Sequence, residues 1–111
     1  MKINEDKITP TVIDLHAAKQ RKLDESWLAM FGGAIKMVLR RMFGESKIPI
    51  HVKGKKSDIK VFAEVLNREK KYMRAYSDLG PNSYATTRSR YELDNAVKRF
   101  EEKTGITWPL K

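Results

Sequence analysis

Apolar residues recur with the period of an α-helix in three stretches of the chain. In the first, Asp24 to Phe43, they cover more than half of the helix circumference, and Lys36 and Arg40 mark the narrow polar side. We expect Asp24 to be the N-cap and Gly44 to end this helix. Such a wide face indicates either a helix central to the core or a helix covered by a partner. A membrane-surface helix is the weaker interpretation, because a small domain needs its most apolar helix for its core.

Two more helices are predicted toward the C-terminus. The first begins with Ser57 as its N-cap and ends at Gly80. The second begins at Asn82 or Thr86 and ends at Gly105. Because their connection is short, they should form an antiparallel hairpin, and the apolar residues 106–110 should fold back onto it. The expected core consists of large apolar side chains from all three helices and this tail: Trp27, Phe31, Ile35, Phe62, Leu66, Leu93, Val97, Phe100 and Trp108.

The remaining elements are a short strand and an N-terminal arm. Residues 47–53 alternate between apolar and other side chains, which predicts one strand, and Pro49 places it at a sheet edge. Residues 1–23 have only one close apolar cluster, Val12, Ile13 and Leu15. Burying three such side chains would contribute roughly 4–8 kcal/mol. Ordering the backbone would cost more, at about 1–2 kcal/mol per residue.

The predicted fold is therefore mainly α with one short β-strand. We expect residues 24–111 to form a single helical domain, with a central amphipathic helix and an antiparallel helical hairpin. Residues 1–23 should be an extended arm that contacts a partner through Val12, Ile13 and Leu15.

Charge gives the broadest functional signal. The chain has 23 Lys and Arg residues against 14 Asp and Glu residues, a net charge of +9, which indicates an anionic partner. The candidate anion-binding residues are the basic side chains of one loop and the two hairpin helices: Lys53, Lys55, Lys56, Lys60, Arg68, Lys71, Arg74, Arg88 and Arg90. Tyr72, Tyr84 and Tyr91 lie among them and could stack on bases. Such charges also commonly do no more than solvate a helix face, and without a base-reading motif any nucleic-acid binding should be directed to the backbone.

Several classes of protein are not expected. The chain has no cysteine, its two histidines lie on separate elements, and it contains none of the common nucleotide-binding or hydrolase motifs. We therefore expect no enzyme activity, cofactor or metal. No apolar signal-peptide core follows the N-terminus, and the most apolar window is interrupted by Lys36, Arg40 and Arg41, so we expect neither signal-peptide secretion nor a transmembrane helix.

The stretch from Asp24 to the end, four-fifths of the chain, contains several distinctive sequence segments. The pieces are DESWLAMFGGAIKMVLRRMFG, FAEVLNREKKYMRAY and LDNAVKRFEEKTGITWPLK, of which the ending R-F-E-x-K-T-G-I-x-W-P is the most distinctive. Together they resemble small uncharacterised proteins of large tailed bacteriophages. The resemblance implies a viral source and favours a virion or host-interaction role.

Two functions remain open from the sequence. The first is a structural or accessory role without enzyme activity. The protein would be a small basic subunit of a larger assembly, and the favoured assembly is a bacteriophage virion. In this function the arm contacts other protein subunits, and the Lys-rich loop contacts an acidic or nucleic-acid surface. The alternative is a soluble nucleic-acid-binding or host-factor-binding phage regulator. The expected location is the virion or the host cytoplasm, without membrane association.

Overall fold

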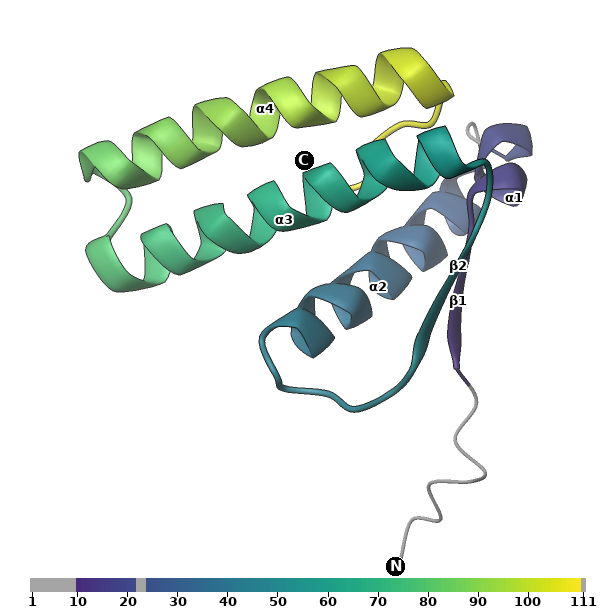
Figure 1. The fold of residues 1–111 in the computed structure, drawn as a ribbon, viewed down its shortest axis with the longest axis horizontal. Helices are drawn as coiled ribbons and strands as arrows, with labels where there is room; N and C mark the ends of the chain where they lie inside the picture. The colour runs from purple at the N-terminus through teal and green to yellow at the C-terminus, as the bar shows by residue number, and fades with distance from the viewer. Residues whose placement is uncertain (1–9, 22–23, 111) are drawn as a thin grey trace, which may run out of the picture.

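The chain is mainly helical, as the apolar periodicity predicts, but its described residues form two strands rather than the one expected. The computed structural model describes residues 10–21 and 24–110, and Figure 1 shows their arrangement. The elements in chain order are β1 (Thr11–Asp14), α1 (Leu15–Gln20), α2 (Glu25–Met42), β2 (Ile50–Lys53), α3 (Lys56–Leu79) and α4 (Tyr84–Thr104). None of the helices in this described part is both long enough and apolar enough to cross a membrane.

Helices α3 and α4 form the expected antiparallel hairpin (Figure 1). Gly80 ends α3 with a φ of 81°, a conformation that favours glycine, and its N–H donates to the Tyr76 carbonyl. The Ser83 hydroxyl then caps α4 by accepting from the Thr86 N–H at 3.1 Å. The Thr86 hydroxyl donates back to the Gly80 carbonyl at 2.7 Å. These bonds fix the turn, so the two helices lie side by side.

The C-terminal segment closes the core between the helices. Gly105 ends α4 with a φ of 73°, and the chain turns back so that Trp108 is only 1% exposed. The Trp108 ring lies 5.4 Å from the Phe100 ring and 5.9 Å from the Phe62 ring, centroid to centroid. The predicted core is confirmed except at Trp27, which is only partly buried.

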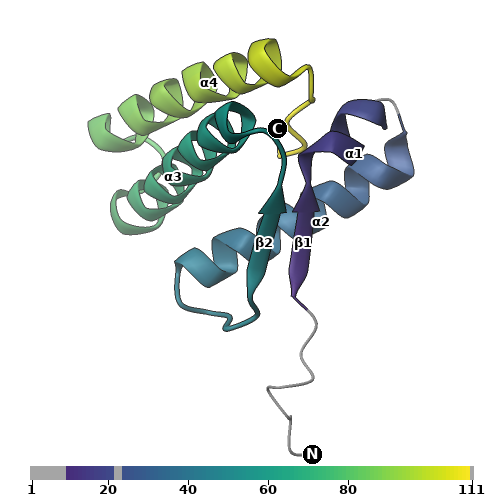
Figure 2. The same cartoon turned by 45° about the vertical axis from the view of Figure 1, so that its right-hand side comes forward.

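Residues 10–21 are part of the fold, so the expectation of an arm outside the core is wrong for them. β1 pairs with β2 in parallel, with Thr11 opposite Ile50, and α2 crosses one face of this small sheet (Figure 2). Ile13 and Leu15 are at most 1% exposed, whereas Val12 is 48% exposed. The first two therefore pack inside the molecule and are not available as partner contacts. Residues 1–9 and 22–23 of the expected arm lie outside the described part of the chain.

Contacts besides the buried side chains of Ile13 and Leu15 offset the ordering cost of this segment. The backbone N–H of Thr11 donates to the Pro49 carbonyl at 2.9 Å, which begins the ladder to β2. Asp14 caps α1 by accepting from the N–H groups of His16 and Ala17. Lys19 on α1 forms an ion pair of 2.5 Å with the Asp58 carboxylate in the first turn of α3. The segment is thus tied to both β2 and α3.

Leu15→Ala should therefore destabilise the protein, because it removes a fully buried side chain and leaves a cavity. We expect a loss of about 2–5 kcal/mol in the free energy of unfolding, measured by denaturant titration. Val12→Ala is the matched control from the same segment, and it should cost much less because Val12 is half exposed. Equal, small losses for the two variants would show that the segment is an arm after all.

Candidate functional site

Four of the predicted basic residues gather where β2 passes into α3. Lys53, Lys55, Lys56 and Lys60 are all exposed, and none forms an ion pair with another described residue. Gly54 forms the turn between the two elements with a φ of 157°. Any other residue at this position would place its Cβ 3.0 Å from the Leu15 Cβ. The four lysines therefore lie around this turn with their side chains exposed to solvent.

The predicted N-cap of α3 is wrong by two residues. The helix begins at Lys56, and its N-cap is Lys55 rather than Ser57. The Lys55 side chain makes no capping hydrogen bond, so the first N–H groups of α3 are not capped by their N-cap side chain. These N–H donors and the positive end of the helix dipole lie among the lysines and add to the attraction for an anion.

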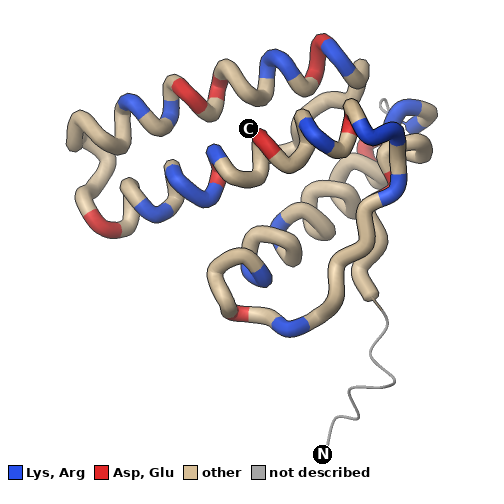
Figure 3. Tube along the Cα trace, in the orientation of Figure 1, with Lys and Arg blue, Asp and Glu red and all other residues tan. Residues whose placement is uncertain are grey.

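The basic residues continue along the outer face of α3. Successive residues turn by about 100° in a helix. This rotation places Lys56, Lys60, Lys71 and Arg74 within one narrow sector of α3, and all four are exposed. Figure 3 shows basic positions recurring along this helix. From Lys56 to Arg74 the row extends about 27 Å, at 1.5 Å per residue.

A charge cluster joins this row to α4. The Glu92 carboxylate forms ion pairs with Arg68 at 2.9 Å, Lys71 at 3.2 Å and Arg88 at 3.5 Å. The hydrogen bond from Lys71 is the main cause that lowers the pKa of Glu92. Three cations thus surround one carboxylate, which leaves the cluster with a net charge of +2. We name the lysines at the start of α3, the row along this helix and the Glu92 cluster the basic face.

One of the predicted residues lies off this face, and another lies at its edge. Arg90 points to a different flank of α4, where it pairs with Asp94 at 3.1 Å and lies over the Tyr72 ring at 5.4 Å. Arg74 stands at the edge of the basic face, with its guanidinium 5.8 Å from the centre of the Phe43 ring. The sequence pattern does not distinguish these residues from the others, because it does not show which neighbours they meet across helices.

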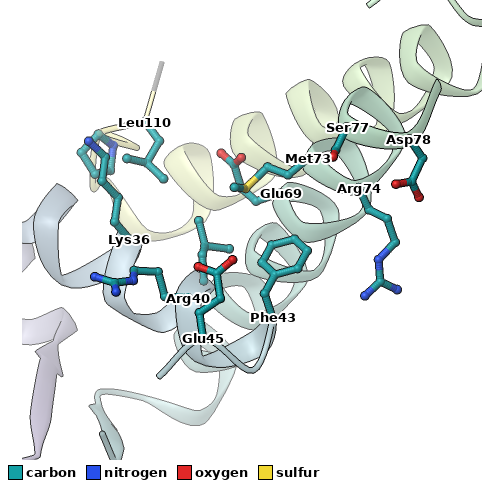
Figure 4. Close-up of a pocket in the computed structure, with 12 residues that line it drawn as sticks. Lys36, Arg40, Phe43, Glu45, Glu69, Met73, Arg74, Ser77, Asp78 and Leu110 are labelled. Carbon is teal, nitrogen blue, oxygen red and sulfur yellow. The ribbon is translucent and has the colours of Figure 1, made fainter. Parts of the chain in front are cut away.

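A groove between α2 and α3 was not anticipated from the sequence. Its volume is about 890 Å³, and its apolar walls include Leu39, Phe43, Met73 and Leu110 (Figure 4). Basic and acidic side chains both reach it: Lys36, Arg40, Arg74, Glu45, Glu69 and Asp78. Because the two signs are mixed, the groove does not extend the basic face. In the described part of the chain, no group of three His, Asp or Glu residues is placed to hold a metal ion.

Glu69 is a groove residue with a second role in the core. It is only 6% exposed, and its Oε1 accepts from the indole N–H of Trp108 at 3.0 Å. Burial raises the pKa of Glu69, although the Trp108 hydrogen bond partly opposes this shift. The Glu69 carboxylate therefore positions Trp108, although burial destabilises the charged form of this carboxylate.

Comparison with known proteins gives no relative for this chain: no protein-family model, curated protein or solved structure matches it. The resemblance to proteins of tailed bacteriophages therefore stays a prediction. The function is therefore inferred from the geometry of the basic face.

Glu69→Gln should remove one contribution to the dependence of stability on pH, the one that lowers stability as pH rises. Since the folded-state pKa of Glu69 lies above its ordinary value of 4.5, the folded state retains this proton when the unfolded state has lost it. The free energy of unfolding contributed by Glu69 thus falls as pH rises above about 4.5. Glutamine keeps an oxygen for Trp108 but does not titrate. The melting temperature of the variant minus that of the wild type should increase from about pH 4 to pH 7. A constant difference over this range would contradict the argument.

Proposed function

We propose that this protein is a non-enzymatic, small basic accessory subunit of a larger assembly that contacts a polyanionic surface through its basic face. The observation that carries the proposal is the group of four exposed lysines where β2 passes into α3: Lys53, Lys55, Lys56 and Lys60. They continue into the basic row along α3. A row of this kind matches the repeated charges of a nucleic-acid backbone or an acidic protein surface.

The resemblance to phage proteins supports a bacteriophage particle as the assembly. The folded position of residues 10–21 removes one argument for this choice, because Ile13 and Leu15 are buried in their own chain. The same observation favours the alternative, a nucleic-acid-binding or host-factor-binding phage regulator that uses the same basic face. A mass-spectrometric inventory of purified particles separates the two: the accessory subunit would be present, and the regulator would be absent.

Binding through lysines and phosphates has a measurable signature. Each cation that neutralises a phosphate releases condensed counterions, so the logarithm of the binding constant falls linearly with the logarithm of the salt concentration. The slope is about −0.9 for each phosphate contact on duplex DNA. Lysines that take part in binding should therefore contribute to the slope as well as to the affinity.

A variant with Lys53, Lys55, Lys56 and Lys60 changed to Ala should bind duplex DNA more weakly at every salt concentration. We expect its salt slope, measured by fluorescence anisotropy, to be less steep by about 3–4, the contribution of four phosphate contacts. The matched control changes four exposed lysines outside the basic face: Lys36, Lys47, Lys98 and Lys103. Both variants lose the same net charge, so only a local site makes the first one weaker.

Equal losses for the two variants would mean that net charge alone attracts DNA. If the wild type does not bind DNA at all, the same pair of variants is tested against the acidic polymer polyglutamate. Absence of binding to both polymers would contradict the proposed function.

A further inference from the structure

Two tyrosines stand on the outer face of α4 with their rings in solvent. Tyr84 is 78% exposed and Tyr91 is 68% exposed, and neither has an aromatic ring partner among the described residues. They lie seven residues apart, which puts them on the same side of the helix. Between them is a shallow hollow of about 510 Å³, lined also by Thr87, Arg88 and Glu92.

Arg88 connects this hollow to the basic face. Its guanidinium donates to the Tyr84 hydroxyl at 3.3 Å and pairs with Glu92 at 3.5 Å. Glu92 is the carboxylate that also holds Arg68 and Lys71 of α3. The two exposed rings are therefore next to a cluster with a net charge of +2. This charge favours an anionic occupant.

The spacing of the two rings suits a chain of unpaired bases. Seven residues of helix extend about 10.5 Å, whereas stacked bases follow one another every 3.4 Å or so. An extended single strand can place one base on each ring and a phosphate near Arg88 between them. In a duplex, the base faces are covered by the neighbouring base pairs, so the tyrosines find no free surface there.

We propose that the hollow between Tyr84 and Tyr91 binds single-stranded nucleic acid, by stacking unpaired bases on the two rings while Arg88, Arg68 and Lys71 contact the backbone. This inference rests on the proposed function, because it uses the same basic face, and it adds a preference for single strands. Aromatic stacking is tolerant of sequence, so the preference is for strandedness rather than for particular bases.

The test compares a single-stranded oligothymidine of roughly 4–16 nucleotides, the usual site size, with a duplex of the same length. Affinities are measured by fluorescence anisotropy for the wild type and for Tyr84→Ala/Tyr91→Ala. We expect the wild type to prefer the single strand and the double variant to lose roughly thirty-fold or more in single-strand affinity, since each lost stacking contact costs about 1–3 kcal/mol. Its duplex affinity should change by less than about twofold, since no tyrosine stacks on a duplex base.

Two control variants make the result specific. Tyr84→Phe/Tyr91→Phe keeps both ring faces and should keep the single-strand affinity. Tyr76→Ala removes another exposed tyrosine, on α3, and should also bind normally. Circular dichroism confirms that each variant retains its helices.

Each other outcome overturns the inference in a recognisable way. Equal wild-type affinity for single strand and duplex, with binding still lost in the four-lysine variant, would contradict the tyrosine site and leave the proposed function intact. Unchanged or equally reduced affinities in Tyr84→Ala/Tyr91→Ala would contradict it as well. Lack of nucleic-acid binding by the wild type would overturn the inference, and polyglutamate binding would then show whether the proposed function survives.

Discussion

The burial of Trp108 between the helices is the contact on which the rest of this fold depends. Its ring packs edge-on against Phe100 and tilted against Phe62, and its indole N–H is satisfied by Glu69. The backbone N–H of Trp108 donates to Glu101 at 2.8 Å, and the following Pro109 lies against the buried Gly32 of α2. One short segment thus links α2, α3 and α4.

This arrangement decides which surfaces are left for a partner. The inner faces of α3 and α4 are used by the aromatic core, so their outer faces must meet solvent. The outer face of α3 carries the row of basic residues, and the outer face of α4 carries the exposed pair Tyr84 and Tyr91. Between them, Glu92 is surrounded by three cations, Arg68, Lys71 and Arg88. The basic face is therefore a consequence of how the hairpin packs.

Local patterns in the sequence were sufficient to predict α2, α3 and α4, but not α1 or the residues at which α3 and α4 begin. The apolar period from Trp27 to Met42, the Asp24 cap and the glycines that end α3 and α4 all act within a few residues, and they are confirmed. β1 was missed because its partner is remote: Thr11 pairs with Ile50, and the intervening chain forms α1 and α2. A parallel strand four residues long has no periodic signal of its own.

The candidate site was predicted only in part, for a related reason. The lysines around Gly54 are close in sequence, and the structure also places them together. Which of the other cations belong to the same face depends on contacts between helices, such as those of Arg68 and Lys71 with Glu92. Arg90 carries the same charge but meets Asp94 and Tyr72 instead. The carboxylate of Glu69 shows the same dependence, because its burial follows from Trp108.

The most direct test of the account is a map of the binding surface in solution. We predict that a short oligonucleotide added to isotopically labelled protein shifts the backbone amide NMR signals of residues 53–60 and of the outer faces of α3 and α4. Signals from β1 and from the α2 side of the groove should stay in place. Shifts concentrated in that groove, or distributed evenly over the molecule, would contradict the claim that the hairpin presents a polyanion-binding face.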